Sequence, residues 1–126
     1  MRRMLRSLGY SLEGLAHAVR RERNIRFFLA GYFVVLCLGA YVSLRSWEWV
    51  AIVLSGGLFL SVELLNTSFE RLTDAFDHAR KLQGDTGLQE GLKWTKDVSS
   101  AAALVALVVN VAVILIVLVP YFLPLR

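Results

Sequence analysis

The sequence has a single cysteine, Cys37, only two prolines, and 19% charged residues. One cysteine excludes an intrachain disulfide framework and a cysteine-based metal site within one chain. The phosphate-binding loops of soluble nucleotide-binding proteins are also absent, because no G-x-x-x-x-G-K-[ST], G-x-G-x-x-G, H-R-D or D-F-G sequence occurs. A soluble nucleotide-binding fold is therefore excluded.

Apolar residues are abundant instead, at 56% of 126 residues, which is too many for an ordinary soluble domain. Three segments are long and apolar enough to cross a bilayer as helices, and they cover about residues 27–44, 47–66 and 101–123. We predict an all-α integral membrane protein, a single domain over residues 1–126.

Ahead of the first span, leucines recur at helical spacing from Leu5 to Leu15, with arginines on the other faces. This pattern predicts an amphipathic helix over about residues 3–24 that lies on the membrane surface. Arg45 and Ser46 alone join the first two spans, so we expect an antiparallel hairpin with Ser46 as the helix cap. We expect the polar stretch 75–95 to be a loop with a turn at residues 84–87.

Positive charge predicts the orientation of the spans. Seven arginines precede the first span and five basic residues lie between the second and third, whereas only Arg45 and Arg126 mark the other side. We expect a multi-pass protein of the bacterial inner membrane with its N-terminus in the cytoplasm. The N-terminal arginines suit anionic lipid headgroups, and we expect no nucleic-acid partner.

A polar stripe follows the end of the second span. Its residues are spaced by three, four and four, which places them on one helix face: Glu63, Asn66, Glu70 and Asp74. A carboxylate at the edge of the hydrocarbon indicates a functional site, because its charged form is costly there and it takes up a proton readily. Glu63 is thus a candidate general base. The alternative is a glutamate paired with a lysine or arginine of another helix.

Glu22 and Glu70 lie at similar predicted depths on two helices. Two such carboxylates, with waters and nucleotide phosphate oxygens, form a typical magnesium site. In the alternative, Glu22 merely pairs with Arg26 and Glu70 with a neighbour on its own helix.

Lys96 and Asp97 open the third span on the same side as the polar stripe. A lysine there can hold phosphate as a point charge, and the alternative is a lysine that extends its amine to the headgroups. We expect Asn110, within the third span, to hydrogen-bond across a helix interface, and Gly56 and Gly57 to permit close packing.

The motifs resemble those of the small prokaryotic diacylglycerol kinase family, which includes undecaprenol kinases. Residues 63–70 read E-L-L-N-T-S-F-E, followed by Asp74, and are similar to its E-L-x-N-[ST]-A-[IL]-E-x-x-x-D signature. Residues 9–15, 22–26 and 96–97 resemble further family segments in the family order. The chain departs from the pattern at Ser68 and Phe69, lacks the histidine before the A-K-D segment, and has about eight extra residues in the connection.

The resemblance implies a homotrimer that transfers the γ-phosphate of ATP to a membrane lipid alcohol, diacylglycerol or undecaprenol, with Mg²⁺ as cofactor. By residue, it implies Glu63 as the general base and Glu22 and Glu70 as magnesium ligands. The implied nucleotide contacts are Arg3, Tyr10, Glu22, Asn66, Glu70, Asp74, Lys96 and Asp97. The implied lipid contacts are Arg26, Glu63 and Ser100. The E-R-N stretch and Asn66-Thr67 are closer to the undecaprenol branch.

Two other classes of function remain open on the residues alone. Glu63 also suits a proton or cation site in a small oligomeric channel or transporter. The outer half of the second span offers no matching relay, which argues against this class. A non-catalytic membrane scaffold would predict that Glu63→Gln changes nothing.

Overall fold

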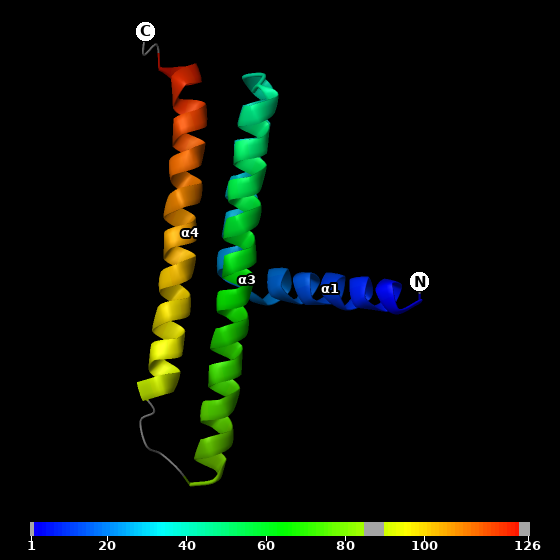
Figure 1. Ribbon diagram of the computed structural model, residues 1–126, viewed down its shortest axis with the longest axis vertical. Coiled ribbons are helices and arrows are strands. Elements are labelled where there is room, and N and C mark those ends of the chain that lie inside the picture. The colour runs from blue at the N-terminus through cyan, green and yellow to red at the C-terminus, as the bar shows by residue number, and fades with distance from the viewer. Residues whose placement is uncertain (1, 85–89, 124–126) are drawn as a thin grey trace. The chain divides into compact units, whose positions relative to one another are not determined.

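The computed structural model describes residues 2–84 and 90–123, and it is helical throughout (Figure 1). The four helices are α1 (Arg2–Arg21), α2 (Arg23–Tyr41), α3 (Ser46–Leu82) and α4 (Glu90–Phe122). They form two compact units, Met1–Tyr41 with α1 and α2 and Val42–Arg126 with α3 and α4. The prediction of an all-α fold is confirmed.

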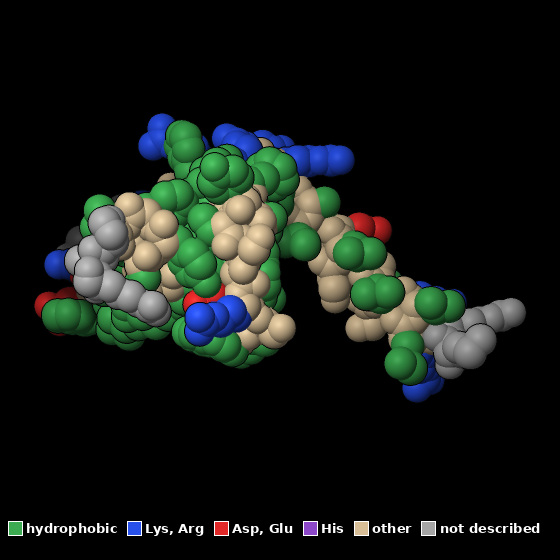
Figure 2. Space-filling view, turned by 90° about the horizontal axis from the view of Figure 1, so that it is seen from above, with side chains coloured by type: hydrophobic (Ala, Val, Ile, Leu, Met, Phe, Trp, Pro, Cys, Tyr) green, Lys and Arg blue, Asp and Glu red, His purple; other side chains and the backbone are tan. Residues whose placement is uncertain are grey.

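Three of the helices, α2, α3 and α4, are long and apolar enough to cross a membrane. Hydrophobic side chains accordingly cover much of the face seen in Figure 2. The chain is a multi-pass membrane protein. At 1.5 Å per residue, the 37 residues of α3 extend over about 55 Å, whereas a hydrocarbon core is about 30 Å thick, so α3 must continue well beyond the lipid tails.

The first unit begins with α1, on which apolar side chains are exposed along one face. Leu5, Leu8 and Leu12 are each more than half exposed, as a helix lying on a membrane surface requires. At the junction of α1 and α2, the Arg26 Nη1 donates to the carbonyl oxygen of Arg20 at 2.8 Å. This bond satisfies a carbonyl in the last turn of α1, where a cation is favourable.

The second unit is a pair of helices, α3 and α4, that run antiparallel along each other (Figure 1). Ile52 and Phe59 of α3 and Ala103 and Val117 of α4 are buried. Asn110, only 2% exposed, accepts a hydrogen bond from the Ser55 Oγ at 3.0 Å, which confirms the predicted bond across a helix interface.

The two glycines of α3 do not behave alike. Gly56 is buried, as a position of close packing should be. Gly57 is exposed, and a Cβ built there would meet nothing within 4 Å, so no described residue of this chain packs closely on it and its predicted packing role stays a prediction.

The start of α3 differs from the prediction. Helix α2 ends at Tyr41, and Ser43 in the connection has a φ of 57°, in the left-handed region. Ser46 is the first residue of α3 rather than its cap, and Arg45 occupies the cap position. The Glu48 carboxylate, at the third position of the helix, accepts the backbone N–H of the cap residue Arg45 at 2.7 Å, which is the acid's part of a capping box.

The expected loop over residues 75–95 is also wrong, because α3 continues to Leu82 and α4 already begins at Glu90. A pair one turn apart, Asp77 and Lys81 at 2.6 Å, supports the end of α3. Gly84, with a φ of 81°, closes the turn after α3 and donates its N–H to the Lys81 carbonyl oxygen. The other predicted turn residues, 85–87, lie outside the described residues.

Candidate functional site

The polar stripe of α3 lies partly buried against α4. Glu63 and Asn66 are 8% and 9% exposed, Glu70 is half-buried and Asp74 is exposed. The Asn66 Nδ2 donates to the Glu70 Oε1 at 3.2 Å. The shared helix face predicted from the spacing is therefore present. Solvent exposure along it increases over about three turns, from the buried carboxylate of Glu63 to the exposed carboxylate of Asp74.

Helix α4 contributes two partners to this stripe. The Lys96 Nζ donates to the Asp74 Oδ1 at 2.7 Å, and the Ser100 Oγ donates to the Glu70 Oε1 at 3.5 Å. Lys96 and Ser100 are four residues apart and so lie one above the other on α4. The antiparallel pair thus brings five predicted site residues into one cluster: Asn66, Glu70, Asp74, Lys96 and Ser100.

Two oxygens in this cluster have no hydrogen-bond donor among the described residues. Asn66 Oδ1 is buried without any partner, which is costly for a polar atom. Both hydrogen bonds to Glu70 end on Oε1, so Oε2 accepts none from the described part of the chain. A carboxylate oxygen and an amide oxygen are hard ligands, which suit Mg²⁺. The cluster therefore offers oxygen ligands for a divalent metal ion and, in Lys96, a positive charge for phosphate.

Four other predicted residues, Arg3, Tyr10, Glu22 and Arg26, belong to the first unit, so a magnesium ion shared by Glu22 and Glu70 stays a prediction. Asp97 is exposed on α4. Within residues 2–84 and 90–123 no three histidine, cysteine or acidic side chains gather around one point, so a bound ion would need oxygens from elsewhere.

The sequence reasoning missed two features of this region. One is the Lys96–Asp74 pair, whose members are 22 residues apart and meet because α3 and α4 pack along each other. The Asp74 carboxylate balances the positive charge of Lys96 and holds the lysine amine beside the polar stripe of α3.

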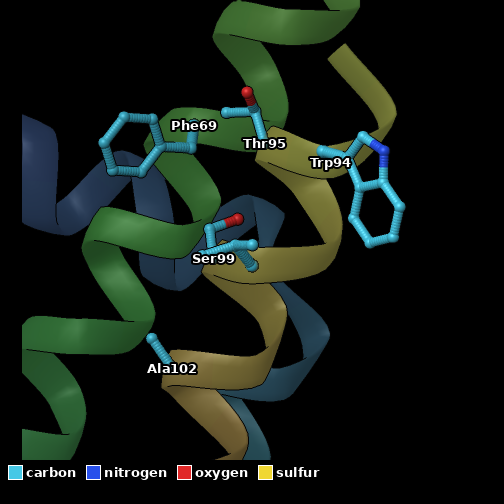
Figure 3. Close-up of a pocket in the computed structure, with 6 residues that line it drawn as sticks. Phe69, Trp94, Thr95, Ser99 and Ala102 are labelled. Atoms are coloured by element: carbon cyan, nitrogen blue, oxygen red, sulfur yellow. The ribbon is translucent and has the colours of Figure 1, made fainter. Parts of the chain in front are cut away.

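The other is an open groove between α3 and α4 (Figure 3). It is lined by Phe69, Trp94, Thr95, Val98, Ser99 and Ala102. Those two hydroxyls donate to carbonyls of their own helix, so the groove is apolar. Its α4 residues share a face on which neither Lys96 nor Ser100 lies, so the groove is separate from the polar cluster.

The fold and the cluster together define a class: a multi-pass helical membrane protein with a buried acid and a lysine-containing polar site at one end of a helix pair. Comparison with known proteins is more specific. The family model of prokaryotic diacylglycerol kinase matches residues 9–118, and the chain belongs to this family.

A curated relative is the undecaprenol kinase of Bacillus subtilis (strain 168), which is 39% identical over 75 residues. The matched region is 59% of this chain and 60% of the relative, so the match covers about three fifths of the relative's length.

Proposed function

We propose that this protein is a lipid kinase that transfers the γ-phosphate of ATP to the hydroxyl of a membrane lipid. The observation that carries the proposal is the α3–α4 cluster, in which hydrogen bonds join Asn66 to Glu70 and Lys96 to Asp74 about one turn along α3 from the buried Glu63. Membership of the prokaryotic diacylglycerol kinase family supports the same activity.

The chemistry assigned to Glu63 is proton removal. As the lipid oxygen bonds to the γ-phosphorus, Glu63 accepts the hydroxyl proton, the bond from phosphorus to the β–γ bridging oxygen breaks, and ADP leaves. Burial at 8% exposure suits this role, because a poorly hydrated carboxylate is a stronger base. Its place at the membrane edge suits a substrate whose hydroxyl arrives from the bilayer.

The other residues position and neutralise the phosphates. Phosphoryl transfer depends on alignment and on charge stabilisation more than on covalent chemistry. We assign Glu70 and Glu22 to Mg²⁺, which supplies charge neutralisation when bound. We assign Lys96 to the phosphates, with Asp74 holding its amine in place at 2.7 Å.

The other nucleotide contacts proposed are Arg3, Tyr10, Asn66 and Asp97, and the proposed lipid contacts are Arg26 and Ser100. We further propose a homotrimer in the bacterial inner membrane, with its N-terminus and the α3–α4 connection in the cytoplasm. The excess of basic residues on that side supports the orientation.

Diacylglycerol and undecaprenol are the two acceptors to compare. The name of the Bacillus subtilis relative favours undecaprenol. Purified protein in mixed micelles with ATP and Mg²⁺ should give radiolabelled lipid phosphate from at least one of the two alcohols. If no membrane lipid alcohol accepts phosphate, and liposomes instead show proton or cation conductance without ATP, the proposal is wrong and a channel is favoured.

A further inference from the structure

The side-chain amide of Asn66 is the least satisfied polar group of the α3–α4 cluster. Asn66 is 9% exposed, and its Oδ1 is buried without a hydrogen-bond donor among the described residues. Buried oxygens of this kind nearly always have a donor, an ordered water or an ion beside them. Asn66 Oδ1 therefore points to a ligand from outside the described part of the chain.

The orientation of this amide is fixed by its neighbour. The Asn66 Nδ2 donates to the Glu70 Oε1 at 3.2 Å, and an ionised carboxylate only accepts hydrogen bonds. If the amide turned over, two oxygens would face each other at that distance. Glu70 thus keeps the amide nitrogen on its own side and leaves Oδ1 for another partner.

Glu70 is itself held from two helices. Its Oε1 accepts hydrogen bonds from the Asn66 Nδ2 on α3 and from the Ser100 Oγ on α4, at 3.2 and 3.5 Å. Both donors are neutral groups, which orient a carboxylate without balancing its charge. The Lys96 amine, by contrast, forms its ion pair with Asp74. Glu70 therefore keeps a negative charge, and neither donor occupies its Oε2.

The chemistry of the site limits what can meet Asn66 Oδ1. A nucleotide phosphate cannot, because its oxygens act as hydrogen-bond acceptors. A hard divalent cation can, because such ions bind carboxylate and amide oxygens together. Asn66 and Glu70 are four residues apart and so lie one above the other on α3. Asn66 Oδ1 and Glu70 Oε2 are thus two hard oxygens on the same helix face.

We propose that Asn66 is a further ligand of the divalent cation, through Oδ1 and beside Glu70, and that Ser100 is a positioning residue that orients the Glu70 carboxylate. The inference rests on the proposed function and deepens it, because it adds a ligand to the proposed Mg²⁺ site. Asn66 contacts the nucleotide through the cation rather than by a direct bond to phosphate.

A change of metal preference tests the ligand. Cys37, the exposed native cysteine, is first replaced by serine, and Asn66→Cys is then introduced into this cysteine-free parent. We measure the concentrations of Mg²⁺ and of Cd²⁺ that half-saturate binding of a non-hydrolysable ATP analogue in micelles without lipid acceptor. A thiolate is a softer ligand than an amide oxygen, so the Mg²⁺-to-Cd²⁺ ratio of these concentrations should rise about tenfold or more over the parent. An unchanged ratio would overturn the proposal.

Asn110 provides the matched control. It is a second buried asparagine, 2% exposed, and its Oδ1 already accepts a hydrogen bond from the Ser55 Oγ. Asn110→Cys in the same parent should leave the ratio unchanged. An equal shift at positions 66 and 110 would mean that the thiol acts without contacting the site, and would also overturn the proposal.

Mn²⁺ affinity separates the ligand from the positioning residue. It is measured with the same analogue from the electron paramagnetic resonance signal of free Mn²⁺. Asn66→Leu should lower the affinity about tenfold, whereas Asn66→Asp, which keeps an oxygen, should stay within about threefold of native. Ser100→Ala should lower it about threefold, because Asn66 still holds the same Glu70 oxygen, and Ser100→Thr should restore it. Native affinity in Asn66→Leu would refute the ligand, and native affinity in Ser100→Ala would refute the positioning role.

These measurements also distinguish this inference from the proposed function, because none of them contains a lipid acceptor. The expected metal preference in a protein that phosphorylates no lipid would contradict the lipid kinase alone. An unchanged metal preference in Asn66→Cys, with an active native kinase, would contradict the Asn66 ligand alone.

Discussion

Glu63→Gln should separate catalysis from folding. The substitution keeps the side chain's size and removes only the proton acceptor, at a position that is 8% exposed. A general base contributes roughly 10²- to 10⁴-fold to a rate, or about 3 to 5 kcal/mol of transition-state stabilisation. We expect turnover to fall by that factor while nucleotide affinity stays within about threefold, since no phosphate contact is removed.

Helix α3 supplies the matched control. Glu48 is also buried, at 6% exposure, but near the other end of the helix. Its Oε2 accepts hydrogen bonds from the Arg45 backbone N–H and from the Tyr121 Oη, each at 2.7 Å, and so ties α3 to α4. Glu48→Gln weakens charge-assisted bonds and should lower Tm while turnover stays within about threefold.

The assays are transfer of radiolabelled phosphate into lipid, calorimetric titration with ATP, and thermal unfolding in micelles. We expect Glu63→Gln to lower turnover and leave Tm unchanged. We expect Glu48→Gln to lower Tm and leave turnover within about threefold of the native value. If Glu63→Gln retains more than a tenth of the native turnover, or loses ATP affinity in proportion to turnover, its role as the base is refuted.

Five further substitutions test the other assignments. Glu22→Ala and Glu70→Ala should each raise the Mg²⁺ concentration needed for half-maximal activity at least fivefold, and unchanged magnesium titrations would remove both as ligands. Lys96→Met should raise KM for ATP about tenfold or more. Asp74→Asn should raise this KM less, because the Lys96 amine is still present but is no longer held by a carboxylate. The reverse order of the two KM values in steady-state kinetics would contradict the assignment. Asn110→Ala should cost about 0.6 kcal/mol of stability with normal kinetics, because it removes one interhelical hydrogen bond within the membrane, and reversible unfolding in micelles measures this.

Local patterns were sufficient to predict the helices and the polar face. Hydrophobic length predicted the three spans, because a helix must satisfy its own backbone inside lipid and needs about twenty residues to cross it. The spacing from Glu63 to Asp74 placed four polar residues on one face, because helical geometry is periodic, and the Asn66–Glu70 hydrogen bond confirms it. The family motifs were likewise readable from the sequence.

Helix ends were harder to predict, because they depend on competition between polar groups. Ser46 has a side chain suited to capping, yet Glu48 satisfies the free N–H of Arg45 from inside the helix. The polar stretch after Asp74 was expected to be a loop, but ion pairs along α3 and across to α4 allow it to remain helical.

The sequence by itself determined that the chain is helical, that it crosses a membrane, and which face of α3 is polar, because each of these follows from interactions within a few residues. Only the tertiary structure decided that Lys96 meets Asp74, that Ser100 meets Glu70, and that the described residues bury Asn66 Oδ1 without giving it a donor. The physical reason is that the two contacts join residues 22 and 30 positions apart. They and the burial of Asn66 depend on how α3 and α4 pack and in which register, and a local sequence period does not specify either.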